Sequence, residues 1–354
     1  MTSRSGDNWQ RSKRDPVVVL AADERFALPL AVTVRSALEN LAANRTLRLF
    51  VLDGGFRDET KQRLERSWQL DRCEISWTAV DPAVLAVAPV SGHANVVNYF
   101  RVLTPWLLPS NVQRVIYLDA DLVVNTDLTR LWESSFDGQL CLAVQDSAAP
   151  YFDALLAMDN YQYCRRHLGS ATPVANYRDL GLNPRGAYFN SGVMLLDLAA
   201  WRAKKIPQRL LACLAKNKPH IRWWDQYALN VVLADSWGFL DPRWNQQSHI
   251  YVYPTWSQSP YDRESFQRLR DEPWIVHFTT RYKPWLASCL HPRRGEFFRY
   301  VDQTDWAQWR PWHGNHLKAA FDYVRAQNRR LRRERHRLVG RVAEVWARWQ
   351  DRAA

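Results

Sequence analysis

The hydrophobic pattern of the chain alternates between short β-branched runs and longer amphipathic stretches. Residues 16–22, 47–52 and 73–80 are apolar runs typical of buried strands. Residues 26–41 and 59–70, which separate these runs, carry apolar positions at helical spacing. Strands that alternate with helices predict an α/β fold with a mainly parallel central sheet covered on both faces.

The alternation continues less regularly toward residue 285. Strands are predicted over 114–118, 140–144, 187–197 and 274–278. Helices are predicted over 93–108, 198–215 and 223–233. The segment 149–185 has weak periodicity and many Tyr, Asn and Arg residues, which indicates a mobile loop or a lid beside a site.

Two carboxylates interrupt the apolar run 115–124. Asp119 and Asp121 follow the strand predicted over 114–118, and in extended backbone residues i and i+2 point to the same side. The pair can therefore present oxygens to one point, as hard divalent cations prefer, at the strand end where open α/β sheets bind ligands. A turn with a helix cap explains the same residues, so from this motif alone both interpretations stay open.

The composition predicts one large domain with appendages. A chain of 354 residues with 47% apolar content can bury a substantial core. The expected parts are a disordered lead at 1–15, a main domain at 16–290, a linker at 291–314 and a basic helix at 315–354. The lead lacks the apolar region of a secretory signal, no stretch is long enough to span a bilayer, and the five cysteines are scattered. A cytoplasmic location is expected.

Much of the net charge of +12 is carried by residues 315–354, which contain eleven basic and four acidic residues. Apolar residues recur from Leu317 to Trp349 at alternating spacings of four and three, which is a heptad seam. The seam predicts self-association in a coiled coil. The Arg-rich face beside Trp346 and Trp349 predicts instead a helix on an anionic membrane surface. A merely solvated helix is the third interpretation.

Several motifs occur in a fixed order between residues 16 and 285. They are Ala21-Ala22-Asp23, Tyr99-Phe100-Arg101, Leu118-Asp119-Ala120-Asp121, Phe189-Asn190-Ser191-Gly192-Val193, Trp224-Asp225-Gln226, and His277-Phe278 followed by Lys283-Pro284-Trp285. Together they resemble glycosyltransferase family 8, the retaining transferases of the GT-A fold, and among them the bacterial lipopolysaccharide galactosyl- and glucosyltransferases. The resemblance implies a GT-A domain, which is a Rossmann-like nucleotide-diphospho-sugar transferase. It implies that this domain moves galactose or glucose from a UDP-sugar to a glycan acceptor.

The resemblance also implies the metal and diphosphate contacts. Asp119, Asp121 and His277 match the ligands of a Mn²⁺ ion, with Mg²⁺ as an alternative, held against the diphosphate. Lys283 matches the residue that pairs with the diphosphate, where a point charge suits a phosphate oxygen. Taken alone, His277 would read as a core histidine at the end of a buried strand.

The remaining site residues follow from the same motifs. Those implied to bind substrate are Ala22 and Asp23 for uracil and ribose, Arg101 for sugar and phosphate with Asn98 near it on the same predicted helix, His93 for acceptor or phosphate, and Ala120 between the aspartates. Those implied to form the donor-sugar pocket are Asn190 and the three catalytic candidates Asp146, Asp225 and Gln226. Two positions depart from the family pattern: Thr280 stands where Gly is usual, and Tyr227 where an acidic residue is frequent.

The expected partners are a UDP-hexose donor and a glycan or lipid-linked acceptor such as lipopolysaccharide. The basic helix over 315–354 is expected to bind either an anionic membrane surface or a second copy of the chain. No nucleic acid is expected as a partner. The location would then be cytoplasmic and peripheral on the inner face of the membrane. The alternatives are a nucleic-acid-binding protein that uses the Arg-rich helix, and a non-catalytic sugar-binding GT-A module.

Overall fold

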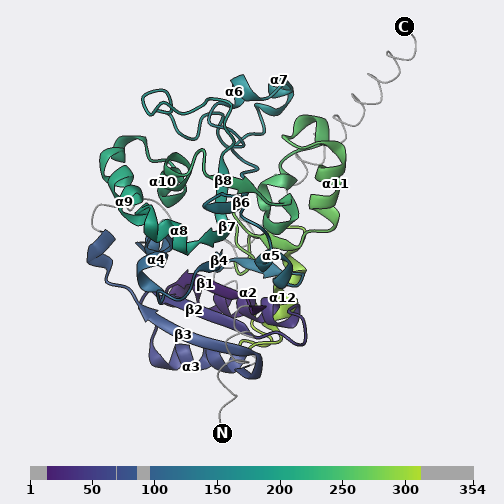
Figure 1. Cartoon of the computed structure of the whole chain (residues 1–354). Coiled ribbons are helices and arrows are strands. Elements are labelled where there is room, and N and C mark those ends of the chain that lie inside the picture. The colour runs from purple at the N-terminus through teal and green to yellow at the C-terminus, as the bar shows by residue number, and fades with distance from the viewer. Residues whose placement is uncertain (1–13, 69, 86–95, 312–354) are drawn as a thin grey trace.

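The structure is a computed structural model of the chain and describes residues 14–68, 70–85 and 96–311. Its centre is a seven-stranded sheet in the order β3-β2-β1-β4-β7-β6-β8, with helices packed around it (Figure 1). The strands are β1 (Val17–Ala22), β2 (Leu47–Asp53), β3 (Cys73–Ala79), β4 (Arg114–Leu118), β6 (Cys141–Gln145), β7 (Phe189–Asp197) and β8 (Trp237–Phe239). The strands β1 to β4 are parallel to one another, and β6 is parallel to β8. The predicted mainly parallel sheet is therefore confirmed.

Strand β7 runs antiparallel to both of its neighbours, β4 and β6. The reversal brings the motif Asn190-Ser191-Gly192, near the start of β7, to the sheet edge where β4 ends at Leu118. The carboxyl end of β4 and the amino end of β7 therefore meet at one place. This is the edge at which parallel α/β sheets bind ligands.

A second sheet of three strands lies beside this edge. It consists of β5 (Leu122–Val124), β10 (Ile275–His277) and β9 (Gln246–Gln247), in the order β5-β10-β9. The apolar run 115–124 is therefore two strands in two sheets, and Asp119-Ala120-Asp121 is the connection between them. This break explains how two carboxylates can interrupt an otherwise buried run.

The helices cover the sheets and connect their strands. The α-helices are α2 (Ala27–Glu39), α3 (Asp58–Ser67), α4 (Thr104–Leu107), α5 (Thr129–Trp132), α6 (Ala154–Ala157), α7 (Tyr161–Cys164), α8 (Leu198–Ala203), α9 (Ile206–Lys216), α10 (Trp224–Val232), α11 (Arg263–Asp271) and α12 (Arg294–Val301). The 3₁₀ helices are η1 (Glu24–Phe26), η2 (Leu70–Arg72), η3 (Pro82–Leu85), η4 (Val96–Leu103), η5 (Lys218–His220), η6 (Pro242–Asn245), η7 (Ser248–Tyr251) and η8 (Trp256–Gln258). Among the described residues no helix is both long and apolar enough to cross a membrane.

Two predicted helices are each divided in the structure. The helix predicted over 93–108 is the 3₁₀ helix η4 followed by the single turn α4, with Pro105 in that turn. The helix predicted over 198–215 is divided into α8 and α9 at Lys205, which has a φ of 53°. Pro207 then lies in the first turn of α9, where its missing N–H costs nothing.

The linker expected over 291–314 is not a linker over the part that the structure describes. It contains α12, whose Phe297, Tyr300 and Val301 are fully buried against Val32 of α2 and Val276 of β10. These residues follow helical spacing, so the helix buries one stripe against the domain. Residues 312–314 of that range, residues 1–13 of the expected lead and the basic helix predicted over 315–354 lie outside the described residues.

The segment 149–185, predicted as a mobile loop or lid, is irregular and carries the short helices α6 and α7 at one end of the molecule (Figure 1). Its base is attached to the sheet region by backbone hydrogen bonds. The N–H groups of Gly169 and Ser170 donate to the carbonyl of Ala148, at 2.7 and 3.2 Å. Asp153 caps α6 by accepting from the N–H of Leu155 at 3.1 Å.

Candidate metal centre

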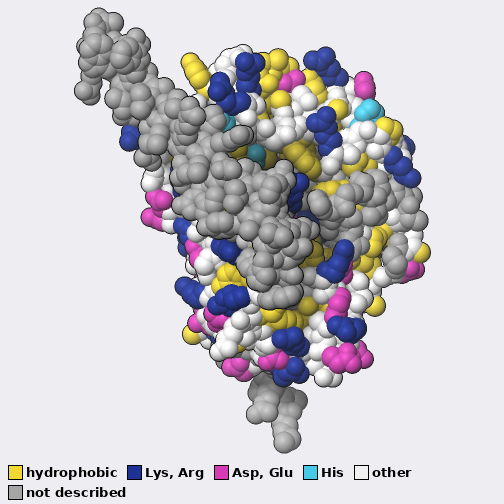
Figure 2. Space-filling view, turned by 180° about the vertical axis from the view of Figure 1, so that it is seen from behind, with side chains coloured by type: hydrophobic (Ala, Val, Ile, Leu, Met, Phe, Trp, Pro, Cys, Tyr) yellow, Lys and Arg dark blue, Asp and Glu magenta, His cyan; other side chains and the backbone are white. Residues whose placement is uncertain are grey.

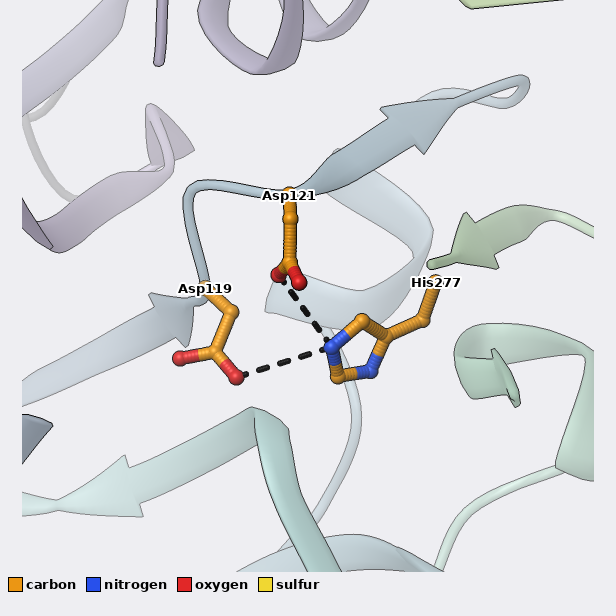
Figure 3. Close-up of side chains that lie close together, drawn as sticks. All are labelled: Asp119, Asp121 and His277. Atoms are coloured by element: carbon orange, nitrogen blue, oxygen red, sulfur yellow. Dashed lines mark ion pairs between the residues drawn. The ribbon is translucent and has the colours of Figure 1, made fainter. Parts of the chain in front are cut away.

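Asp119, Asp121 and His277 lie together where the two sheets meet. Asp119 follows β4, Asp121 precedes β5, and His277 ends β10, which pairs antiparallel with β5 so that His277 faces Leu122. One potential ligand atom from each of the three side chains lies within 4.8 Å of the others. Figure 3 shows Nε2 of His277 between the carboxylates, 3.6 Å from Asp119 Oδ2 and 3.3 Å from Asp121 Oδ1.

The donor set and the space around it fit a divalent cation. Two carboxylates and one imidazole suit a transition-metal ion such as Mn²⁺, and carboxylates suit Mg²⁺. Gly192 of β7 leaves the space open, because a Cβ there would lie 2.2 Å from Cε1 of His277 and 2.8 Å from Oδ2 of Asp119. The carbonyl of Gly192 accepts from the N–H of Asp119 at 2.8 Å, which holds the turn against β7.

Lys283 lies on one side of the cluster. Its Nζ donates to Oδ2 of Asp121 and, at 2.6 Å, to the carbonyl of Phe278. Burial of Asp121 raises its pKa, but Lys283 and His277 together outweigh that effect and hold the pKa well below its usual value. Asp121 is therefore ionised at neutral pH, as a metal ligand must be.

Asn245, the last residue of η6, orients His277. Its Oδ1 lies 2.8 Å from Nδ1 of His277, and its Nδ2 donates to Oδ1 of Asn190 at 2.9 Å. An amide oxygen only accepts, so the facing Nδ1 carries the hydrogen, and in the neutral ring Nε2 keeps its lone pair for a metal ion. Asn245 was not predicted from the sequence. Its only sequence signal is its position before β9, and no local pattern reveals the pairing of β9 with β10.

Arg101 lies on the opposite side of the cluster and is only 6% exposed. Its Nη2 donates to Oδ1 of Asp119 at 2.7 Å, its Nη1 to the carbonyl of Ser191 at 2.6 Å, and its Nε lies 3.0 Å from Oδ2 of Asp225. The guanidinium also stacks over the ring of Tyr117, 4.5 Å from its centre. Arg101 thus connects the metal candidates to Asp225.

Asp225 is deeply buried, and burial raises its pKa to about 6 although Arg101 acts in the opposite direction. The preceding residue, Trp224, begins α10 with a φ of 44°, in the left-handed region that a bulky side chain rarely adopts. Such local strain is held in place by the surrounding structure. Here it lies directly before the two predicted residues Asp225 and Gln226.

Asp146, Asn190 and Gln226 form a hydrogen-bonded polar cluster beside Arg101 and Asp225. Oδ2 of Asp146 accepts from Nδ2 of Asn190 and from Nε2 of Gln226, both at 3.0 Å. Nδ2 of Asn190 also lies 3.2 Å from Oε1 of Gln226. The structure thus brings together the four residues that the sequence assigned to the donor sugar.

Asp23 and Ala22 lie at the carboxyl end of β1, the neighbour of β4 in the sheet. Asp23 caps η1, since its Oδ1 accepts from the N–H of Arg25 at 3.1 Å, and its Oδ2 pairs with Nη2 of Arg25 at 2.8 Å. The capping interpretation of Asp23 is therefore observed. It leaves the predicted role in nucleotide binding open.

The other predicted contacts are distributed around the cluster. The carbonyl of Asn98 accepts from Nε of Arg101 at 3.1 Å. Ala120 is buried, and its carbonyl accepts from Oγ1 of Thr33 at 2.8 Å. His93 lies outside the described residues.

The two departures from the family pattern are accommodated differently. Thr280 does not adopt a positive φ, so the loop after His277 needs no glycine conformation at that position. Tyr227 is fully buried, and its hydroxyl donates to Oδ1 of Asn176 at 2.7 Å. Tyr227 thus joins α10 to the segment that carries α6 and α7.

Comparisons with known proteins identify relatives over most of the chain. The family model "Glycosyl transferase family 8" matches residues 17–289. The chain is 30% identical over 292 residues to "General stress protein A" of Bacillus subtilis (82% of this chain, 94% of the relative). It is 21% identical to "Lipopolysaccharide 1,2-glucosyltransferase" of Escherichia coli K12 over 291 residues (82% and 78%).

Among solved structures, the galactosyltransferase LgtC in complex with donor and acceptor sugar analogs is similar with a TM-score of 0.67. The two share 21% sequence identity, over 81% of this chain and 96% of LgtC. At this identity the similarity concerns the fold. The predicted GT-A fold class is therefore confirmed.

Proposed function

The chain belongs to glycosyl transferase family 8, and from this premise we propose that it moves galactose or glucose from a UDP-sugar to a glycan acceptor with retention of configuration. Membership confirms the predicted family and the predicted class of enzyme, a glycosyltransferase. The observation that carries the proposal is the cluster of Asp119, Asp121 and His277, flanked by Lys283 and Arg101. Two cations beside a divalent-metal site suit a diphosphate.

Asp119, Asp121 and His277 would hold Mn²⁺, or alternatively Mg²⁺. When bound, such an ion neutralises negative charge that develops on the departing nucleoside diphosphate. Lys283 adds a second positive charge next to Asp121, where an ammonium group can meet a phosphate oxygen. His93 is proposed as a further contact to phosphate or acceptor, and Asn98 as a further contact to substrate.

Ala22, Asp23 and Ala120 are proposed to hold the nucleoside. Strands β1 and β4 are adjacent and parallel, with Leu20 opposite Leu118, so their carboxyl ends lie at the same edge of the sheet. A nucleotide that reaches the metal candidates after β4 therefore passes the end of β1.

Asp146, Asn190, Asp225 and Gln226 are proposed to bind the donor sugar. Sugar hydroxyls both donate and accept, and a mixture of amides and carboxylates can satisfy both roles. Gln226 carries a neutral amide, which is a poor nucleophile. We therefore favour front-face return, in which the acceptor oxygen bonds to the anomeric carbon on the face that the diphosphate leaves, and its proton passes to the diphosphate.

The acceptor is proposed to be lipopolysaccharide or another surface glycan, and the location the inner face of the membrane. The relative named as a lipopolysaccharide glucosyltransferase supports the acceptor class. The basic helix predicted over 315–354 supports either membrane contact or self-association.

A donor screen tests the proposal. The purified chain is incubated with Mn²⁺ and UDP-galactose or UDP-glucose, and UDP release is measured. Release from one donor that EDTA and Asp121→Asn abolish supports the proposal. Asp127→Asn is the matched control, because Asp127 is a carboxylate close in sequence that accepts from the N–H of Thr129, the first residue of α5. Binding of a UDP-sugar without any turnover would favour the non-catalytic module, and no binding in calorimetry would refute the proposal.

A further inference from the structure

Apolar side chains gather on the end of the molecule that carries α6 and α7. Leu155 and Leu156 of α6, Tyr163 of α7 and Trp256 of η8 are 55%, 43%, 65% and 36% exposed. They are half of the eight large apolar side chains that the described residues expose. We call these four residues, with the neighbouring Arg165 and Arg166, the α6–α7 tip.

Hydrogen bonds join α7 to η8 within the tip. Nδ2 of Asn160, directly before α7, donates to the carbonyls of Ser257 and Ser259 at 3.2 and 2.9 Å. Trp256 is thereby held beside α7 although it is distant in sequence. Beneath the surface, Ala154 and Cys164 are fully buried in a small apolar cluster. The exposed leucines therefore lie on the outer face of a packed element.

Among α6, α7 and the residues that adjoin them, exposed basic side chains outnumber acidic ones. Arg165 and Arg166 are exposed next to Tyr163, while Asp159 is an exposed acid between α6 and α7. Figure 2 shows hydrophobic and basic side chains side by side at this end of the molecule. Leucines that can enter hydrocarbon, Tyr and Trp at the headgroup level, and arginines that meet anionic headgroups form the composition of a bilayer interface.

The size of the tip also favours lipid over a protein partner. A stable protein interface uses about 20–30 residues on each side. Helices α6 and α7 have four residues each, and they form a protruding end rather than a broad face (Figure 1). Shallow insertion into a membrane needs only a few apolar side chains.

We propose that the α6–α7 tip inserts into the interfacial layer of a membrane that contains anionic lipids. The tip is rooted at the candidate site, since Oδ1 of Asp146 accepts from the N–H groups of Ala148 and Ala149 at 2.7 and 3.0 Å, at the start of the segment. Insertion would hold the site next to the bilayer and select a lipid-linked acceptor. Only this choice of acceptor rests on the proposed function; the membrane contact does not.

Selective labelling tests the contact in the full chain. All five native cysteines are buried, so a fluorophore sensitive to polarity can be attached to Leu155→Cys. With vesicles of phosphatidylglycerol and phosphatidylcholine, its emission should shift to the blue and be quenched by brominated lipids. The control is Gln62→Cys on α3, at the opposite end of the molecule (Figure 1), whose emission should not change.

Substitutions measure the contribution of each part. Leu155→Glu with Leu156→Glu should weaken vesicle binding at least about tenfold. Arg165→Gln with Arg166→Gln should weaken it roughly thirtyfold on anionic vesicles and little on neutral ones, about fivefold per charge. Both pairs should leave UDP release without vesicles unchanged, since none of these residues touches the candidate site.

Two results would overturn the inference. One is unchanged emission at position 155 while the protein binds vesicles, which would assign binding to another surface. The other is self-association in sedimentation that Leu155→Glu with Leu156→Glu removes, without vesicle contact, which would make the tip a protein interface. Absent UDP release together with a normal blue shift would refute the proposed function and leave this inference standing.

Discussion

Oδ1 of Asn245 lies 2.8 Å from Nδ1 of His277, and this contact decides which ring nitrogen faces Asp119 and Asp121. The same amide donates to Asn190 at 2.9 Å, so one side chain connects the metal candidates with the proposed donor-sugar residues. In the metal site that we propose, Asn245 is a positioning residue that orients a ligand without touching the ion.

Asn245→Ala should weaken Mn²⁺ binding about 10- to 100-fold, because the imidazole loses the partner that fixes its orientation. Asn245→Asp keeps an acceptor for Nδ1 and should recover most of the affinity. Calorimetric titration with Mn²⁺ measures both. The control is Asn40→Ala, which removes a partly buried amide that bonds Val124 and Tyr300 and none of the three ligand candidates. Equal effects of the Asn245→Ala and Asn40→Ala variants on affinity would contradict the assignment.

The sequence predicted the parts of the site that depend on local geometry. Asp119 and Asp121 stay close because they are two residues apart in the short bend between β4 and β5, and the strand before them was predicted at its observed limits, 114–118. Asn245 escaped prediction because it reaches His277 only through the pairing of β9 with β10. Long-range pairing leaves no periodic signal in one sequence.

Two other differences between the sequence-based expectation and the structure also arise from contacts between elements distant in sequence. On a predicted helix, Arg101 reads as a surface group, yet it is buried because Asp119 and Asp225 compensate its charge from other elements. Helix α12 was expected to be linker, because four apolar residues in so short a stretch, mixed with charged ones, are a weak signal. Its burial depends on packing against α2, which is distant in sequence, and against β10, which precedes it.

Arg101→Met should destabilise the fold by about 3–5 kcal/mol, since it leaves the buried carboxylate of Asp225 and the partly buried one of Asp119 without their cation. Arg101→Lys retains a charge but cannot contact Asp119, Ser191 and Asp225 together, so its loss should be smaller but measurable. Urea unfolding gives both values. Combining Arg101→Met with Asp225→Asn should recover part of the stability, and strict additivity of the two losses would argue against the pair.

Asp225 should make the stability of the metal-free protein fall as pH rises from about 4 to about 6. Burial raises its pKa from 3.8 to about 6, so in this range the folded state keeps a proton that the unfolded state has lost. Its stabilising contribution is complete below pH 3.8 and lost above pH 6. The Asp225→Asn side chain cannot titrate. The free energy of unfolding of this variant, relative to that of the wild type, should therefore increase by about 3 kcal/mol from the bottom to the top of this pH range. Urea unfolding at several pH values tests this, and a constant difference would contradict it.

Gly192→Ala should weaken Mn²⁺ binding more than tenfold, because the added methyl group occupies space beside the imidazole of His277. Metal affinity typically falls by about this factor when the residue that orients a ligand is lost. The added Cβ would lie 2.2 Å from Cε1 and 2.7 Å from Nδ1 of His277. The glycine carbonyl is bonded to the N–H of Asp119, so β7 cannot move away without moving a second ligand candidate. The ring must shift instead, which breaks its contact with Asn245.

The matched control for that substitution is Gly295→Ala in α12, where a Cβ would have no neighbour within 4 Å. It should leave Mn²⁺ affinity unchanged and raise stability by up to about 1 kcal/mol, as alanine replaces glycine in a helix. Both variants are compared by titration with Mn²⁺ and by thermal unfolding with and without the ion. Wild-type affinity in the Gly192→Ala variant would mean that the ion binds elsewhere, because no ligand arrangement that uses His277 in its present position tolerates that Cβ.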